Sequence, residues 1–265
     1  MPLLAYNYFG SKLKTIYLFD VDGTLTPAKS KIDQGFAKVF YNWQKSREVY
    51  IVSGGSFPRI VDQLGRKIAD QMLGVFSCMG NAHYKKIPDK DGYSSWVLKY
   101  ENKFTVEKPR LFFSELERYV MNSDYHTKTG RHYEERVGMV NFSIVGRNAT
   151  TKERKEYEEY DKENKEREKI VAKLSDKHSA LDFVIGGAVS IDIFNKGHDK
   201  GQVVQHFADK LEDHRIVFVG DRIKFPGNDY SLAEAVRRYP NCEAIEVNSW
   251  EDTARLLKTD LFASG

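Results

Sequence analysis

The stretch IYLFDVDGTLT, residues 16–26, constrains the fold more than any other part of the chain. Its first four residues form a short unbroken apolar run, which is typical of a strand buried on both faces in a parallel sheet. Polar chemistry begins where that run ends: Asp20 and Asp22 are one residue apart, and Gly23 permits a sharp turn. Thr24 and the neighbouring N–H groups can then face a small anion. Two carboxylates this close either bind a hard cation or have their pKa values pushed apart. We favour these interpretations over two aspartates that merely cap a strand end.

Composition excludes several classes of partner. The chain has 265 residues with 41 basic and 38 acidic side chains, so its formal charge of +3 creates no global field for nucleic acid or an anionic membrane. The two cysteines, Cys78 and Cys242, lack metal-site spacing and suit a reducing compartment. The first residues, MPLLAYNYFGSKLK, have no basic segment before their apolar patch, and no apolar run reaches membrane-spanning length. We expect a cytoplasmic protein that binds neither nucleic acid nor membrane.

Strands and helices alternate towards both ends of the chain. Residues 33–46 and 57–72 place apolar side chains at helical spacing, and buried strands are expected at 49–52, 75–77 and 216–219. This alternation predicts a parallel, doubly wound α/β layer. The strand at 49–52 leads into Ser53-Gly54-Gly55-Ser56, which is either an ordinary glycine turn or a junction that presents a hydroxyl and N–H donors to a phosphate.

The pattern changes from about Ile87. Aromatic and charged residues mix there, and a helix is predicted at 110–121, an alternating strand at 137–145, and a strand, a turn and a second strand within 183–194. Residues 150–174 open with a capping box, and their acids and bases interleave as on a solvated helix face rather than a nucleic-acid site. We therefore predict a core formed by residues 1–85 and 195–265, an inserted α+β cap formed by residues 86–194, and a site between them.

The DxDGT sequence resembles the first motif of the haloacid dehalogenase (HAD) superfamily of phosphotransferases. The resemblance implies a Rossmann-like core in which Asp20 is the nucleophile and Asp22 is the acid/base. It also implies that Mg²⁺ binds a carboxylate oxygen of Asp20, the main-chain carbonyl of Asp22 and the carboxylate of Asp221.

Phosphoryl transfer further requires charge neutralisation and donors around the phosphate oxygens. Lys200 is the candidate that would neutralise charge on the pentacovalent phosphorus. Ser53, or alternatively Ser56, would donate a hydroxyl hydrogen bond, and Asp229 would support the water ligands of the metal. Taken alone, Lys200 would be interpreted as a solvated lysine. Only its occurrence together with the other candidate site residues assigns it a catalytic role.

Four segments together resemble eukaryotic-type phosphomannomutase over nearly the whole chain: FDVDGTLTPAKSKI, EERVGMVNFSIVGRNATTKERKEYEEYDKENKEREK, IGGAVSIDIFNKGHDKG and GDRIKFPGNDYSL. The resemblance implies sugar-phosphate contacts at Arg136, Arg147, Arg154, Ser190 and Asp192. Their chemistry agrees, because guanidinium groups grip phosphate bidentately, and because Ser190 and Asp192, two apart on one strand, share a face. Separate surface ion pairs are the alternative for the three arginines.

The chain departs from the family pattern at several positions. Lys29 stands at the phosphate-binding position where the family has arginine, which keeps the charge but loses bidentate geometry, and Ser53 stands where many members have glycine. Arg136 and Arg147 are eleven residues apart, so an uninterrupted strand would place them on opposite faces, and we expect Gly146 to end the strand. The later segment YSLAEAVRRYP predicts a helix, and we do not carry over the second cation site of the family.

The resemblance implies interconversion of mannose 6-phosphate and mannose 1-phosphate for GDP-mannose synthesis, with Mg²⁺, a hexose 1,6-bisphosphate activator, and a homodimer formed through the cap. Because an aspartyl phosphate can be hydrolysed, a mutase needs a cap that excludes water. The main alternative is a HAD sugar-phosphate phosphatase, which has no need for the second phosphate grip that the cap arginines would provide. A catalytically idle binding protein is a further alternative, and the presence of Asp20, Asp22 and Asp221 argues against it.

Overall fold

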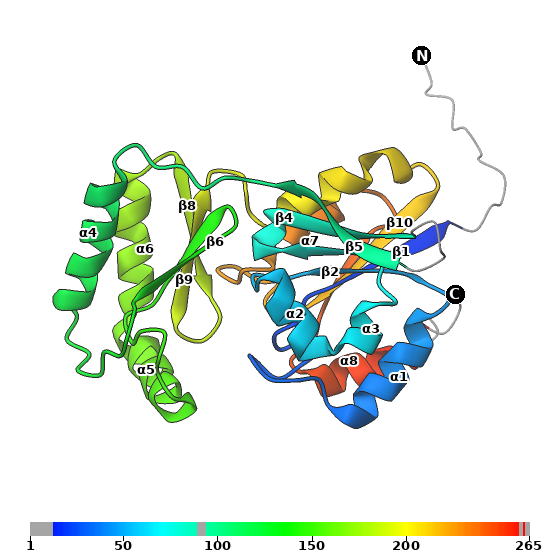
Figure 1. Ribbon diagram of the computed structural model, residues 1–265, viewed down its shortest axis with the longest axis horizontal. Coiled ribbons are helices and arrows are strands. Elements are labelled where there is room, and N and C mark those ends of the chain that lie inside the picture. The colour runs from blue at the N-terminus through cyan, green and yellow to red at the C-terminus, as the bar shows by residue number, and fades with distance from the viewer. Residues whose placement is uncertain (1–12, 89–93, 260–261, 263–265) are drawn as a thin grey trace, which may run out of the picture.

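The computed structural model describes residues 13–88, 94–259 and 262, and its strands form two sheets (Figure 1). In spatial order the larger sheet contains β11 (Glu243–Glu246), β10 (His214–Gly220), β1 (Lys14–Phe19), β2 (Glu48–Val52), β3 (Gly74–Ser77), β4 (Ala82–Pro88) and β5 (Ser94–Glu101). The strands from β11 to β3 run parallel, whereas β4 and β5 add an antiparallel edge. The parallel α/β layer predicted from the sequence is therefore confirmed.

Helices cover both faces of the seven-stranded sheet, and together they form the core (Figure 1). One face carries α1 (Gln34–Gln44), α2 (Phe57–Leu64), α3 (Arg66–Ala69) and α8 (Trp250–Leu256), and the other carries the 3-10 helix η2 (Lys200–Lys210) and α7 (Tyr230–Arg237). Alternate residues of β1 pack into the two layers: Tyr17 and Phe19 on the α1 side, and Ile16 and Leu18 on the η2 side. This two-sided burial is the reason why the strand is apolar without alternation.

The smaller sheet is antiparallel and belongs to the cap. In spatial order it contains β6 (Tyr133–Arg136), β7 (Met139–Phe142), β9 (Ser190–Asn195) and β8 (Leu181–Gly186). The cap helices are α4 (Pro109–Met121), α5 (Thr151–Asn164) and α6 (Glu166–Lys177), of which α4 and α6 cover the sheet face that points away from the core (Figure 1). The predicted capping box is confirmed, because Thr150 and Glu153 exchange side-chain bonds with each other's backbone at the start of α5.

Two predicted helices are each divided by a residue with positive φ. The segment predicted at 57–72 breaks at Gly65, with φ 78°, and the charged segment at 150–174 breaks at Lys165, with φ 55°. Glycine adopts this conformation without steric cost, whereas lysine does so only where the surrounding structure stabilises it. Apolar periodicity alone does not register such breaks, because it continues across them.

The strand predicted at 137–145 is wrong in extent. The chain instead forms a hairpin in which β6 ends at Arg136, Gly138 turns with φ 65°, and β7 starts at Met139. Arg136 is therefore the last residue of one strand of the hairpin, and Arg147 follows the other strand. Because β7 ends at Phe142, Gly146 does not end the strand as we expected. This arrangement removes the conflict of faces, because the hairpin brings the two arginines back to the same carboxylate.

The edge strand β5 belongs to the core sheet by its hydrogen bonds. Its residues pair with β4 in antiparallel register, although we expected it to lie in the cap, which we had predicted to span residues 86–194. The mixed aromatic and charged residues of this segment are typical of a half-exposed edge strand, which explains why they differed from the buried parallel strands. The division at 85/86 and 194/195 remains a proposal, and sheet pairing favours a first crossing after Glu101.

Candidate active site

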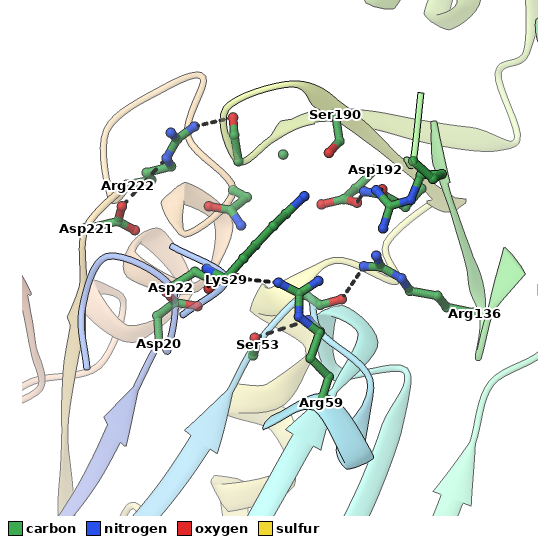
Figure 2. A pocket seen from close by; sticks show the side chains of 17 residues that line it. Asp20, Asp22, Lys29, Ser53, Arg59, Arg136, Ser190, Asp192, Asp221 and Arg222 are labelled. Atoms are coloured by element: carbon green, nitrogen blue, oxygen red, sulfur yellow. Dashed lines mark hydrogen bonds and ion pairs between the residues drawn. The ribbon is translucent and has the colours of Figure 1, made fainter. Parts of the chain in front are cut away.

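The candidate active site lies at the carboxyl ends of the parallel strands, where the cap faces the core (Figure 2). Asp20 follows β1, Ser53 follows β2 and Asp221 follows β10. The loops after neighbouring parallel strands converge at this edge, so ligands of open α/β sheets bind there. The cavity has a volume of about 70 Å³, and cap and core residues both line it.

A fully buried lysine joins two carboxylates at the floor of the site. The Nζ of Lys200 donates to Asp20 Oδ1 at 2.6 Å and to Asp229 Oδ1 at 2.5 Å. Its exposed fraction is 0%. Burial alone would lower the pKa of Lys200, but the two carboxylates raise it, so the ammonium stays charged. Burial raises the pKa of Asp20 well above its usual range, and the charge of Lys200 opposes that shift.

Three carboxylates gather beside this lysine. Oxygen atoms of Asp20, Asp221 and Asp229 all lie within 4.8 Å of one another. Burial, followed by the charge of Asp229, raises the pKa of Asp221 to about 6. Gly23 is required next to this cluster, because its φ is 87° and a Cβ there would lie 2.3 Å from Asp221 Oδ2. Closely spaced carboxylate oxygens are the donors that Mg²⁺ prefers, so this cluster fits the metal.

Asp22 is held apart from the three-carboxylate cluster. Its Oδ1 accepts hydrogen bonds from the backbone N–H of Lys29 at 2.5 Å and from Gln63 Nε2 at 2.8 Å. Its Oδ2 lies 3.7 Å from Arg59 Nη2. This carboxylate is therefore separate from the three-carboxylate cluster and borders the cavity, as an acid/base requires.

The cap wall is a connected polar network on the side of its sheet that faces the cavity. Arg136 and Arg147 both bond Oε2 of Glu134, the former at 2.8 Å. Arg147 also donates to Asn141 Oδ1, and Asn141 Nδ2 donates to Asp192 Oδ1 at 2.6 Å. Burial raises the pKa of Asp192, and the charge of Arg136 opposes the shift. A single carboxylate shared by two arginines leaves donor capacity for an incoming anion.

Cations of the core and of the cap gather around the cavity. Burial, together with the charges of Arg154, Arg147 and Arg59, lowers the pKa of Lys29 to about 7. Arg136 reaches across the cavity and donates from Nη1 to the Gly54 carbonyl at 2.9 Å (Figure 2). Crowded cations of this kind favour a ligand that carries several negative charges.

The sequence from residue 36 to residue 263 matches the family described as eukaryotic phosphomannomutase. The chain belongs to this family. It is 34% identical over 261 residues to a phosphomannomutase from Saccharomyces cerevisiae, covering 98% of each chain. It is also 34% identical over 247 residues to a phosphomannomutase from Spinacia oleracea, covering 92% of this chain and 95% of the relative.

Solved structures agree on the fold of this phosphomannomutase family member. A phosphatase of the haloalkanoate (HAD) enzyme superfamily from Bacteroides thetaiotaomicron has a TM-score of 0.56 at 16% identity, with 97% of each chain covered. An IMP-bound IMP-nucleotidase from Plasmodium falciparum has a TM-score of 0.59 at 13% identity, covering 93% of this chain and 67% of that one. These likenesses establish a HAD-like α/β fold.

Most of the site residues expected from the phosphomannomutase resemblance meet at one cavity. The lining includes Asp20, Asp22, Lys29, Ser53, Arg136, Arg147, Ser190, Asp192 and Asp221. Lys200 and Asp229 lie behind Asp20. Two expected residues are outside the lining: Ser56 is the residue before α2, and Arg154 on α5 donates from Nε to the Ala149 carbonyl at 3.3 Å. Of the two serines, Ser53 is therefore the one that faces the cavity, with its Oγ accepting the N–H of Gly55.

The sequence interpretation missed four lining residues with long or amide side chains: Arg59, Asn141, Arg222 and Asn228. Arg222 directly follows Asp221 and donates from Nη1 to the Gly187 carbonyl of the cap at 2.8 Å. Its position beside a predicted metal ligand was a signal that could have been used. Asn141 and Arg59 gave no such signal, because only the folded cap sheet and helix α2 bring them to the cavity.

Proposed function

We propose that this phosphomannomutase, an isomerase, interconverts mannose 6-phosphate and mannose 1-phosphate through an aspartyl phosphate on Asp20. The observation that carries the proposal is the pairing of two sites across one cavity: the Asp20–Lys200 pair in the core and the linked arginines Arg136 and Arg147 in the cap. A bisphosphorylated sugar requires both, because one phosphate reacts while the other is held.

In the proposed reaction, one carboxylate oxygen of Asp20 attacks phosphorus of a hexose 1,6-bisphosphate. The bond from phosphorus to the sugar oxygen breaks, and Asp22 donates a proton to that leaving oxygen. In the return step Asp22 accepts the proton of the incoming sugar hydroxyl, which attacks the aspartyl phosphate. When the 1-hydroxyl of mannose 6-phosphate accepts the group, the sugar turns over in the site, and Asp20 then removes the phosphate at carbon 6.

In the proposed reaction, Lys200 acts next to the nucleophile Asp20. Its ion pairs with Asp20 and Asp229 fix the attacking carboxylate, and its positive charge balances the negative charge that develops at the phosphorus. Mg²⁺, held by Asp20, Asp221 and the carbonyl of Asp22 with Asp229 in support, would supply electrostatic stabilisation to the transferring phosphoryl group. The hexose 1,6-bisphosphate activator would load Asp20 with its first phosphate. Ser190 and Asp192 are positioned on β9 to bind sugar hydroxyls.

We also propose that the cap opens and closes in each encounter with substrate, because residues of the cap and of the core line the cavity together. In this proposal the cap moves away to admit substrate and returns to exclude water while the aspartyl phosphate exists. Closure distinguishes a mutase from the alternative, a HAD sugar-phosphate phosphatase.

We further propose cytoplasmic function in GDP-mannose supply, and a homodimer formed through the cap. Support for the dimer comes from β6, which is the edge strand of its sheet, and from Leu111 and Met121 on α4, whose exposed fractions are 64% and 76%. Support for the compartment comes from the free thiols Cys78 and Cys242. Among the described residues, no helix is long and apolar enough to cross a membrane.

The function is tested by incubating purified protein with mannose 1-phosphate and Mg²⁺, with and without a hexose 1,6-bisphosphate. We expect mannose 6-phosphate to form, the activator to accelerate its formation, and inorganic phosphate release to be much slower. Phosphate release as the main reaction, independent of activator, would identify a phosphatase instead.

The Arg147→Ala variant tests the cap grip. Loss of a charge-assisted bond to the distant phosphate should reduce isomerisation about ten- to hundredfold, since such a bond contributes about 1.5–3 kcal/mol. Hydrolysis of acetyl phosphate, which never reaches the cap, should stay near the wild-type rate. The matched control is Arg118→Ala on α4, outside the cavity lining. Equal losses on both substrates in the Arg147 variant would contradict a grip by the cap.

A further inference from the structure

The hydrogen bonds of Asp22 distinguish its two carboxylate oxygens. Oδ1 accepts two donors, the N–H of Lys29 at 2.5 Å and Nε2 of Gln63 at 2.8 Å. Among the residues that the structure describes, Oδ2 has only the looser contact with Arg59, at 3.7 Å. An oxygen that already accepts two short bonds is a poor site for a proton, because a protonated oxygen would oppose its donors. Oδ2 is therefore the oxygen available for proton transfer.

Gln63 is held in one orientation by the groups around it. Its Oε1 accepts Nε–H of Arg59 at 3.3 Å, and a guanidinium has no acceptor, so the oxygen of the amide must face that side. The NH₂ group then faces Asp22, and it also lies 3.3 Å from Thr26 Oγ1 and from the Ser30 carbonyl. The side chain is buried, with 5% exposed. Such an amide is fixed by its neighbours and not by solvent.

Gln63 also fixes the backbone that carries the second donor to Asp22. Its own carbonyl accepts the N–H of Ile32 at 2.9 Å, and its NH₂ group contacts the Ser30 carbonyl. The turn between Thr26 and Ile32 includes Lys29, whose φ is 59°, so this turn needs external support. Gln63 thus donates directly to Asp22 Oδ1 and contacts the turn that carries the other donor, although it does not itself line the cavity.

We propose that Gln63 is a positioning residue for the acid/base step: it occupies Oδ1 of Asp22, so that Oδ2 faces the sugar oxygen and transfers the proton. The inference rests on the proposed function, since it assigns an atom to the proton transfer described above. Without Gln63, rotation of the Asp22 carboxylate is less restricted, and the reacting oxygen spends less time at hydrogen-bond distance from the sugar.

The Gln63→Met variant tests this role, with two phosphoryl donors that differ in their need for a proton. Mannose phosphate loses an alkoxide-like oxygen that Asp22 must protonate, whereas acetyl phosphate releases acetate, a stable anion that needs no proton. We expect kcat for isomerisation to fall about ten- to hundredfold with KM changed less than about threefold. Phosphorylation of Asp20 by acetyl phosphate, measured by rapid quench, should stay within about twofold of wild type.

Gln44→Met is the matched control. Gln44 is also a buried amide on a core helix, and its Nε2 donates to the Ile68 carbonyl at 3.1 Å, away from the cavity. The Gln44→Met variant should lower stability, and it should change the rates with mannose phosphate and with acetyl phosphate by similar factors. Equal losses with both donors in Gln63→Met, or unchanged isomerisation, would overturn the proposal. If Gln63→Met does not fold, Gln63→Asn replaces it, because a shorter amide cannot bridge Arg59 and Asp22, and full activity there would overturn the proposal as well. Failure of the wild-type protein to isomerise mannose phosphate would instead contradict the proposed function.

Discussion

The Asp20→Asn variant should be unable to form a phosphoryl enzyme and should lose isomerisation by more than about 10⁴-fold, because a neutral amide oxygen is a far weaker nucleophile than a carboxylate. The fold should persist, since the amide has nearly the same volume and can still accept the Lys200 ammonium at the position of Oδ1. The measurement is acid-quenched trapping of radiolabel from a hexose 1,6-bisphosphate, beside the steady-state rate.

Asp33→Asn is the control for this substitution. Asp33 is the N-cap of α1 and accepts the N–H groups of Gly35 and Phe36, a role that asparagine fills equally well. That variant should label and turn over as wild type does. An Asp20→Asn protein that still accumulates label, or that keeps more than about one hundredth of the wild-type rate, would show that another residue is the nucleophile.

The sequence predicted the core because its signals are local there. An apolar run that ends in DxDGT contains both the buried strand and the residues that follow it, so Asp20 and Asp22 could be placed without knowledge of any other segment. The same holds for Asp221 at the end of β10. Strand ends of a parallel sheet meet at one edge, so these two separate local patterns indicated a single site.

The cap-side details needed the folded chain. The hairpin turn at Gly138 brings Arg136 and Arg147 to the same Glu134 carboxylate, and no periodicity of two residues predicts such a return. Arg59 reaches the cavity from a helix whose apolar spacing identified only its buried face. Residues with long side chains project to sites that their own segment does not reveal, which is why the sequence missed this residue.

The choice between Ser53 and Ser56 likewise depended on the geometry of one turn. Ser53 immediately follows β2 and lines the cavity, whereas Ser56 precedes α2 and lies outside the lining. Sequence spacing left both open, because either hydroxyl of an SGGS junction can face a ligand, depending on the turn between strand and helix.

The Lys200→Met variant should lower the free energy of unfolding by about 3–5 kcal/mol at neutral pH in the absence of Mg²⁺, because removal of one partner leaves buried charges uncompensated. Lys200 is the ammonium that bonds both Asp20 and Asp229, and Asp221 lies in the same cluster. Isomerisation should be lost as well, since the attacking carboxylate loses the donor that fixes it.

Urea unfolding monitored by tryptophan fluorescence measures the stability change, and Lys210→Met serves as control. The partly exposed Lys210–Glu48 pair, at 3.0 Å, should contribute only about 0–1 kcal/mol.

The destabilisation in Lys200→Met should have two signatures that simple loss of packing would not produce. Burial already raises the pKa of Asp221 to about 6 and raises that of Asp20, and removal of the ammonium should raise both further. For an acid whose pKa is higher in the folded state, the penalty is complete above that pKa, shrinks as the pH falls below it, and is gone below the pKa of the unfolded state. The stability deficit should therefore shrink between about pH 8 and pH 5.

Mg²⁺ should stabilise the variant more than wild type, because it binds the folded state and supplies the missing positive charge, while activity stays lost. A deficit that is independent of both pH and Mg²⁺ would show that Lys200 acts through its aliphatic chain rather than through its charge.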